Sequence, residues 1–260
     1  MKTVLATALV LLAATPASAL VWDQKGKPDT VQFSRGFGGV CQGCDLAGRI
    51  MDRARLSGGM FARSDFTGTR LRGATLAGST FGGANFSRAE LIGAEINSSN
   101  FAGANFQGAC LERVEATGAN FASANMASAQ MALSEFIGSN LAGAMMLGVS
   151  ATRAQFIGSN LSRADLSRGD FRQAVFTGAN LAGARLDRAD FSRADLVGAN
   201  LVRVRAAQAD FAEADLTDAN IAGADLSSAR NLTADQVETA CGDAATRLPG
   251  GLSVRLCPRR

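Results

Sequence analysis

The residues of this chain best suited to chemistry are its cysteines. Cys41 and Cys44 form a Cys-x-x-Cys pair, Cys241 and Cys257 lie near the C-terminus, and Cys110 stands alone between them. A Cys-x-x-Cys pair can be redox-active, bind zinc or form a structural disulfide. A redox pair is typical of a βαβ context, which this sequence lacks. Zinc needs two further ligands, and the chain has no second such pair and no His. We therefore favour a structural pair, able to close as a disulfide after export.

The cysteines at the other end form the second candidate disulfide. A bond between Cys241 and Cys257 would close the C-terminal tail in an oxidising compartment. Cys110 falls in an outward phase of the pattern described below, so we expect a lone surface thiol.

Groups for catalysis are missing from the sequence. The chain has no His and no Tyr, and it contains neither a Gly-x-Ser-x-Gly nor a phosphate-loop motif. Acidic pairs are present, but a general acid needs a shielded site to shift its pKa. The sequence therefore predicts no catalytic residue, no metal ligand and no cofactor, and the protein is expected not to be an enzyme.

The cysteines flank a repeat that dominates the chain. Every fifth residue from Leu46 to Leu226 is apolar: of 37 positions, fifteen are Leu, thirteen Phe, four Met, two Ile and three Ala. The residue two places earlier is small, and is Ala in 24 of 38 cases from Cys44 to Ala229. On an α-helix, apolar residues five positions apart would spread around the whole circumference, and on a flat strand they would alternate between the two faces. The chain must therefore turn at each pentad, as in a solenoid.

A second period gives the number of pentads in one coil. Phe occupies one column at positions 61, 81, 101 and 121, and Leu continues it at 141, 161, 181 and 201. Twenty residues therefore bring the chain back above itself, and the coil has four sides. Asn marks the same period at positions 100, 120, 140, 160, 180, 200 and 220.

These pentads resemble a known family. The runs GANLA (178–182), RADFS (188–192) and EADLT (213–217) are similar to the pentapeptide-repeat family, with its pattern Ala-(Asp/Asn)-Leu-x-x. The resemblance implies an all-β fold, a right-handed quadrilateral parallel β-helix over residues 46–229. About nine coils of roughly 4.8 Å each would make a rod of about 43 Å. Similar Cys-x-x-Cys lead-ins open other domains of this family.

The N-terminal flank reads as a secretory signal. Residues 1–19 contain Lys2, an apolar core over 4–14 and a small-residue cleavage site ending at Ala19, which predicts a periplasmic or secreted protein. The apolar core is too short to span a bilayer, so no stable membrane insertion is expected. Residues 20–45 are expected to form a lead-in that covers the first coil.

The C-terminal flank, residues 230–260, predicts a second cover. Thr233 is a candidate N-cap and Gln236 follows three residues later, which indicates a short helix running to about Cys241. A helix over the last coil would bury its apolar end. The stretch 232–252 also resembles a tail that often follows pentapeptide repeats.

The net charge limits the kinds of partner that we expect. The net charge is +3, and loss of Lys2 with the signal leaves 25 minus 23, or +2, which favours neither nucleic acid nor membrane binding. Charged residues form columns at the twenty-residue spacing, which we interpret as a solvated surface. These columns include Glu95, Glu115 and Glu135, then Asp170, Asp190 and Asp210, and the pair Arg168 and Arg188.

The sequence therefore predicts an exported, non-catalytic scaffold that acts as a monomer or dimer through contacts with an unknown protein partner. Two alternatives remain. The resemblance suggests a DNA-mimicking protein that binds gyrase, although this chain is not acidic and its signal directs it out of the cytoplasm. The other is a self-assembling structural protein of the envelope.

Overall fold

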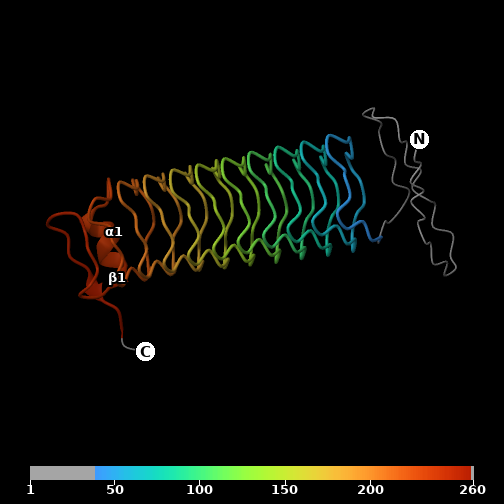
Figure 1. Ribbon diagram of the computed structural model, residues 1–260. Helices are drawn as coiled ribbons and strands as arrows, with labels where there is room; N and C mark the ends of the chain where they lie inside the picture. Colours follow the sequence, from blue (N-terminus) through green and yellow to red (C-terminus); the bar gives the residue numbers. More distant parts are fainter. Residues whose placement is uncertain (1–38, 259–260) are drawn as a thin grey trace, which may run out of the picture.

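The protein is a straight rod of stacked coils. The structure, a computed structural model, describes residues 39–258. The chain climbs coil by coil from the blue to the orange end of Figure 1, and an irregular tail closes the C-terminal end. The expected signal peptide and most of the expected N-terminal lead-in lie outside the described residues. Within those residues, no helix is long and apolar enough to cross a membrane.

Each side of a coil contains a single residue paired with the next coil. Parallel bridges join residues twenty apart, from Val40 with Met60 to Asp210 with Arg230. Two of every five residues form the turn at a corner, and this leaves only three for the side between corners. The all-β expectation is therefore met by isolated bridges rather than by long strands.

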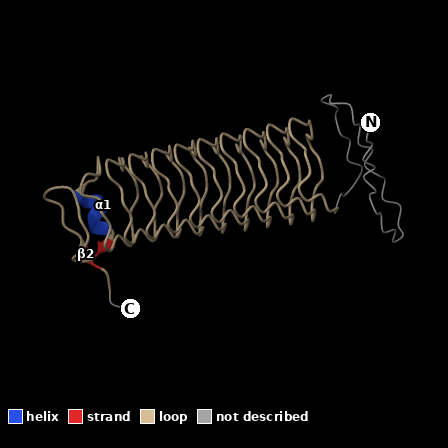
Figure 2. Cartoon of the chain, viewed as in Figure 1, coloured by secondary structure: helices blue, strands red, loops and turns tan. Residues whose placement is uncertain are grey.

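Elements of regular structure occur only in the tail of the described chain. They are α1 (Ala234–Thr239), β1 (Cys241–Gly242) and β2 (Arg255–Leu256). Figure 2 shows all three at one end of the rod, with loops and turns elsewhere. The two strands pair in parallel, Cys241 opposite Arg255 and Gly242 opposite Leu256.

Backbone hydrogen bonds explain why the chain holds a five-residue unit. In a pentad that follows an Asp or Asn, every N–H finds an acceptor, which a buried backbone requires. The central residue and the second turn residue donate to the following coil, the bridge residue donates to the preceding coil, and the first residue after the turn closes the turn itself. The remaining N–H, on the first turn residue, donates to the side chain of the preceding Asp or Asn. In the pentad 101–105 these bonds are Phe101 to Asn120 O (2.7 Å), Ala102 to Asn100 Oδ1 (3.1 Å), Gly103 to Ala122 O (2.9 Å), Ala104 to Phe101 O (2.9 Å) and Asn105 to Ala84 O (2.9 Å).

Leu, Phe and Ala fill the interior along its whole length. The large central residues and the small residues two places earlier both face inward and are buried almost throughout. Phenylalanine rings stack in columns, and the rings of Phe81 and Phe101 lie nearly parallel with their centroids 4.9 Å apart. Neighbouring columns meet edge to face, as Phe81 does with Phe86 at 5.4 Å. Both geometries are favourable for aromatic pairs.

The tail continues the winding and then covers its end. Cys241 bridges Asn220 and Arg247 bridges Asp225, so the chain still follows two sides of a coil. The helix α1 is shorter than the sequence suggested, because Ala240 is extended and Cys241 already belongs to β1. Thr233 caps it in a capping box with Gln236. The amide of Gln236 donates to the carbonyls of Phe211 (2.8 Å) and Ala214 (2.7 Å), which belong to the last complete coil.

Candidate functional site

Any site on the coils must be built from the outward positions. These are the bridge residue and the two turn residues of each pentad, and stacking places each on a column. We name four faces by their bridge residues, spaced twenty apart. Face 1 runs from Val40 to Asn220, face 2 from Asp45 to Asp225, face 3 from Ile50 to Arg230, and face 4 from Arg55 to Asp215.

Face 1 carries an asparagine ladder. From Asn120 to Asn200 each amide nitrogen donates to the Oδ1 of the Asn one coil earlier, at 3.0–3.4 Å, and Asn100 is the first acceptor. The same oxygens accept the N–H of the first turn residue, as Asn140 accepts from Ala142 at 3.2 Å. The Asn side chains therefore stabilise both the turn and the stacking, which explains their recurrence without a ligand.

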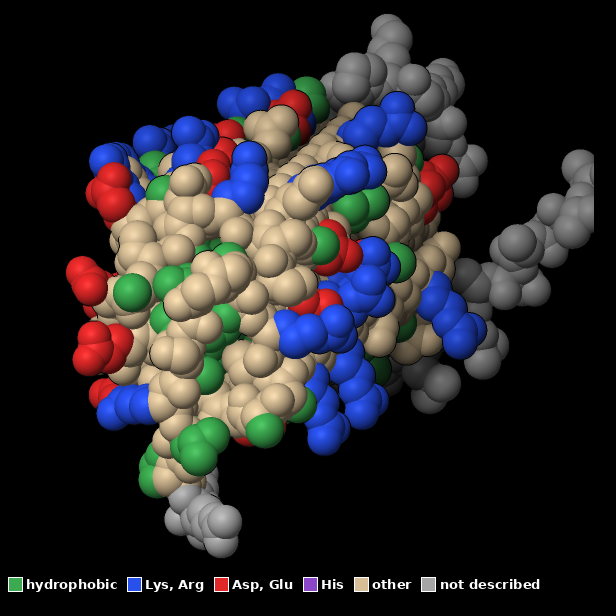
Figure 3. All heavy atoms as spheres, turned by 90° about the vertical axis from the view of Figure 1, so that its left-hand side faces the viewer, with side chains coloured by type: hydrophobic (Ala, Val, Ile, Leu, Met, Phe, Trp, Pro, Cys, Tyr) green, Lys and Arg blue, Asp and Glu red, His purple; other side chains and the backbone are tan. Residues whose placement is uncertain are grey.

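The acidic columns that the sequence predicts lie on faces 3 and 4. Glu95, Glu115 and Glu135 are consecutive bridge partners on face 4, and none forms an ion pair with a described residue. On face 3, the Arg172 guanidinium donates to both oxygens of Asp170 and lowers the pKa of that carboxyl. Figure 3 looks onto the C-terminal end, with acidic side chains along its left edge and basic ones crowding the right flank.

The four cysteines near the ends form two disulfides. Cys41 and Cys44 are joined across the first corner, with their Cα atoms 5.5 Å apart. Cys241 and Cys257 join β1 to the chain after β2, with Cα atoms 4.7 Å apart.

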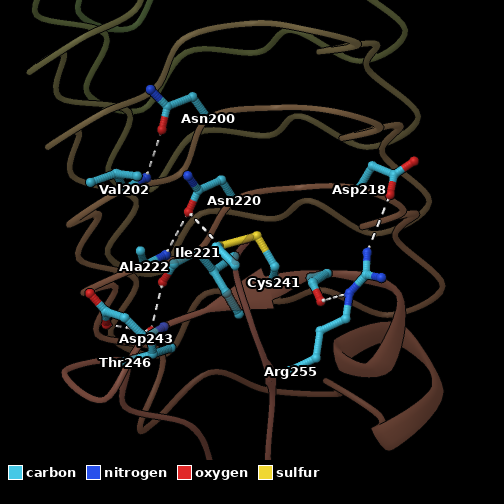
Figure 4. The surroundings of a disulfide bond; sticks show 12 residues. Asn200, Val202, Asp218, Asn220, Ile221, Ala222, Cys241, Asp243, Thr246 and Arg255 are labelled. Carbon is cyan, nitrogen blue, oxygen red and sulfur yellow. Dashed lines mark hydrogen bonds and ion pairs between the residues drawn. A yellow bond between two sulfur atoms is a disulfide. The ribbon is translucent and has the colours of Figure 1, made fainter. Parts of the chain in front are cut away.

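The second disulfide lies among contacts that bind the tail to the rod (Figure 4). Arg255 donates to Asp218 at 3.3 Å and to the carbonyl of Ala240 at 3.0 Å. Asp243 accepts from the backbone N–H of Gly223 at 2.8 Å. The two disulfides therefore occupy structural positions, one at each end of the coil stack.

Cys110 is a free thiol at a bridge position of face 3, where it is half-buried. Burial raises its pKa, and the charges of Glu90 and Glu112 raise it further. The thiol is therefore protonated at neutral pH and is a weak nucleophile. Among the described residues, no group of three or more His, Cys, Asp or Glu could hold a metal ion.

Open grooves lie at the corners, whereas a small apolar hollow beneath the last coil, beside Phe211 and Leu232, has no room for a water molecule. Among the grooves lined by described residues, a wide one of about 660 Å³ lies at the corner between faces 2 and 3. Arg168, Arg185 and Arg188 contribute to its wall. A second, of about 480 Å³, follows the corner between faces 3 and 4 beside Arg153 and Arg193. Neither groove is predicted by the sequence. The available signal was the repeated choice of Arg at the second turn position, where Gly is the commoner residue.

Comparison with known proteins identifies the repeat. The family model described as pentapeptide repeats matches the chain in 8 copies, over residues 40–77, 70–101, 99–134, 134–173, 170–205 and 194–230. No curated protein matches the chain.

Several solved structures are similar to it at low identity. HetL, a pentapeptide repeat protein involved in heterocyst differentiation regulation in the cyanobacterium Nostoc sp. strain PCC 7120, is 22% identical with a TM-score of 0.39, over 81% of this chain and 85% of HetL. Full-length QnrB1, a plasmid-mediated fluoroquinolone resistance protein, is 20% identical with a TM-score of 0.40, over 79% of this chain and 94% of QnrB1. A pentapeptide repeat protein from the Arabidopsis thaliana thylakoid lumen is 24% identical with a TM-score of 0.24, over 41% of this chain and 68% of its own. Because each of these TM-scores is below 0.5, the family assignment rests on the match to the repeat model.

Proposed function

The chain belongs to the pentapeptide-repeat family, and on this premise we propose that it is an exported, non-catalytic scaffold acting through protein–protein contacts. The observation that carries this proposal is the filled interior. Thirteen Phe side chains are buried, none of them more than 2% exposed, and the columns of Leu, Phe and Ala pack against each other from the first coil to the last. What the rod offers to other molecules is its rigid outer surface, as in other solenoids.

Export is supported by the cysteines together with the N-terminal sequence. Both terminal cysteine pairs are placed so that a disulfide closes, and such bonds persist in oxidising compartments. Residues 1–19 have the charge, apolar core and small-residue site of a signal peptide. Neither observation depends on the other.

Mimicry of DNA is the weaker alternative for this chain. A duplex mimic needs a dominant negative field, whereas the whole chain has 26 basic and 23 acidic residues. Uniform acidic columns occur on parts of faces 3 and 4, but Arg occurs on the corners beside them.

The test is cell fractionation with N-terminal sequencing of the native protein, followed by chemical cross-linking in the same fraction. We expect a chain that begins at Leu20, lies outside the cytoplasm, and cross-links to a protein of a different sequence. An intact chain recovered from the cytoplasm would refute export. A correctly exported chain that cross-links only to its own copies would favour the self-assembling structural protein.

A further inference from the structure

Face 2 and its two corners carry a local excess of positive charge. In three successive coils they present six Arg but only two acidic side chains, Asp165 and Asp187. We call the six residues the basic patch. Its members are Arg163, Arg168, Arg185, Arg188, Arg203 and Arg205.

Most of this charge is not neutralised within the rod. Arg185 contacts both acidic residues, Asp165 at 3.7 Å and Asp187 at 3.4 Å. Arg188 donates to Gln208 at 3.2 Å instead. The other four members are exposed and form no ion pair with any residue between 39 and 258. A carboxylate that binds these arginines would therefore break no existing ion pair, although the charge of Arg205 already lowers the pKa of Asp225, its bridge partner on face 2.

Four of these arginines occupy a backbone conformation that costs free energy. Arg163, Arg168, Arg188 and Arg203 have φ between 56° and 60°, the left-handed region that glycine adopts without strain. A side chain there costs on the order of 1 kcal/mol. At the corner between faces 4 and 1, the same turn position is Gly from Gly118 to Gly198 and never Arg. The arginines of the basic patch are thus retained where the fold itself favours glycine.

The basic patch borders the 660 Å³ groove between faces 2 and 3, and the lining of that groove is not purely charged. Leu147 lines one end and is 42% exposed, and Met145 beside it on face 2 is 49% exposed. Ser167 also lines the groove but is only 5% exposed, and its hydroxyl has no hydrogen-bond partner. A buried hydroxyl without a partner is rare in folded proteins. The groove therefore combines basic, apolar and uncharged polar residues.

The dimensions suit a short extended segment. From Leu147 to Ser228 the groove crosses four coil-to-coil steps. At about 4.8 Å per step this is about 19 Å, the length of about six residues of an extended polypeptide at roughly 3.3 Å each.

We propose that this groove binds an extended acidic segment of the partner protein, with an apolar side chain against Leu147 and Met145 and carboxylates against Arg168 and Arg188. The proposal rests on the scaffold function proposed above and specifies its partner. A polyphosphate or acidic glycan would leave the two apolar side chains uncovered. A flat anionic lipid surface would not enter the groove, and Asp165 and Asp187 disfavour any uniformly negative ligand.

The test uses an array of immobilised octapeptides built from Asp, Glu, Leu, Ile, Ser and Gly, probed with the oxidised mature protein. A matching array with Lys in place of Asp and Glu is the charge control. We expect binding to acidic peptides that contain Leu or Ile, weaker binding to those without an apolar residue, and none to the Lys array. The best peptide is then measured in solution by fluorescence anisotropy.

Charge reversal locates the binding. Arg168→Glu with Arg188→Glu should weaken the best peptide at least tenfold, and Leu147→Ser should weaken it several-fold. Arg63→Glu with Arg88→Glu is the matched control, because both residues lie at corners of the same face, outside the basic patch, with φ of 58° and 57°. The control should change affinity less than twofold. Glutamate is compatible with this backbone, since Glu213 has φ 56° at the same turn position.

Three results would overturn the proposal. These are no selective acidic binding on the array, equal losses in the test and control variants, and binding to phosphatidylglycerol vesicles but to no peptide. A partner cross-linked to another face would reject the groove while leaving the scaffold function intact.

Discussion

Among single residues, neighbouring interior positions compensate for each other in side-chain volume. Ala116, Ala151 and Ala206 replace the large central residue, and in each case the preceding interior residue is Val rather than Ala. All six side chains are buried. A core of this density tolerates exchanges that conserve volume better than losses.

The first prediction concerns this exchange. Val149→Ala should lower the free energy of unfolding by about 2 kcal/mol, because it deletes buried methyl groups beside Ala151, where no large residue can compensate. Ser150→Ala, at the next and exposed position, should stay within about 0.5 kcal/mol. Chemical denaturation of both variants measures the difference, and equal losses would show that Val149 does not fill the interior.

The second prediction contradicts the repeat consensus. Ala is the commonest residue at the small interior position, so Gly169→Ala looks stabilising from the sequence. In the structure a Cβ at Gly169 would lie 2.4 Å from the Phe171 ring and 3.1 Å from the Leu166 carbonyl. Overpacking of this kind costs about 2 kcal/mol.

The control for that substitution is Gly82→Ala. A Cβ at Gly82 would meet only the Ala102 carbonyl, at 3.8 Å. Thermal unfolding should place Gly169→Ala well below the parent and Gly82→Ala close to it. A stabilised Gly169→Ala variant would mean that the Phe171 ring moves aside freely.

At the scale of elements, the asparagine ladder couples a turn to its neighbours. Asn140 accepts from Ala142 in its own turn, donates to Asn120 and accepts from Asn160. Asp performs only the accepting part, and does so at Asp165 and Asp195.

The third prediction separates the two parts. Asn140→Ala should destabilise the rod by about 1 kcal/mol, because it removes the acceptor of the turn N–H as well as the ladder bonds. Asn140→Asp should cost less, since it keeps the turn acceptor. Equal denaturation midpoints for the two variants would show that the turn bond is unimportant.

The helix α1 lies on the end of the stack through the buried side chain of Val237, the bond from the Asp218 N–H to the Thr239 carbonyl (3.0 Å), and one side chain at its cap. Gln236 accepts the Thr233 N–H and donates to two carbonyls of the last complete coil, so it connects the helix cap to the rod. Short helices are marginal without such contacts.

The fourth prediction follows from that connection. Gln236→Ala should cost about 2 kcal/mol, through the lost cap and the unpaired carbonyls. Amide exchange should quicken in α1 and in the coil beneath it. Glu238→Ala, on the exposed side of the same helix, should leave both unchanged. Slow exchange retained in Gln236→Ala would mean that the other contacts of the tail, among them Arg255 with Asp218 and the disulfide, are enough to fix it.

At the scale of the whole molecule, the acid response is set by carboxylates bonded in the folded state. The pKa of Asp170 is lowered by its hydrogen bonds with Arg172, that of Asp215 by Thr217 and that of Asp225 by Ser227. Because the folded protein holds these carboxyls ionised, its stability is complete above the pKa of an unfolded Asp, about 3.9. That stability is lost as the pH falls through the lower folded values.

The fifth prediction is a flat melting temperature between about pH 5 and pH 8, since the chain has no His, and a decline below about pH 4. Asp170→Asn should make the acid decline shallower, because it removes one of these carboxyls. Calorimetry across this range measures both effects. A steep change near pH 6.5 would point to another titrating group.

The architecture could be predicted from the sequence because its five- and twenty-residue periods are local and strict. Each pentad repeats the same turn, buried positions and bridge, so adding the steps gives a four-sided coil with Phe and Leu inside. The columns of Asn, Glu and Asp follow from the same arithmetic, whereas the N-cap at Thr233 was predicted from Gln236 three residues later.

The contacts between side chains of different coils could not be predicted in this way and are seen in the folded rod. The pairing of Arg185 with two aspartates, the unpartnered hydroxyl of Ser167, and the ring that excludes a methyl group at Gly169 depend on rotamers and on neighbours twenty residues away. The same holds for Gln236, whose sequence position indicates a helix cap but not its bonds to the last coil. Periodicity fixes where each backbone position lies, whereas the chemistry of the surface depends on which side chains meet there.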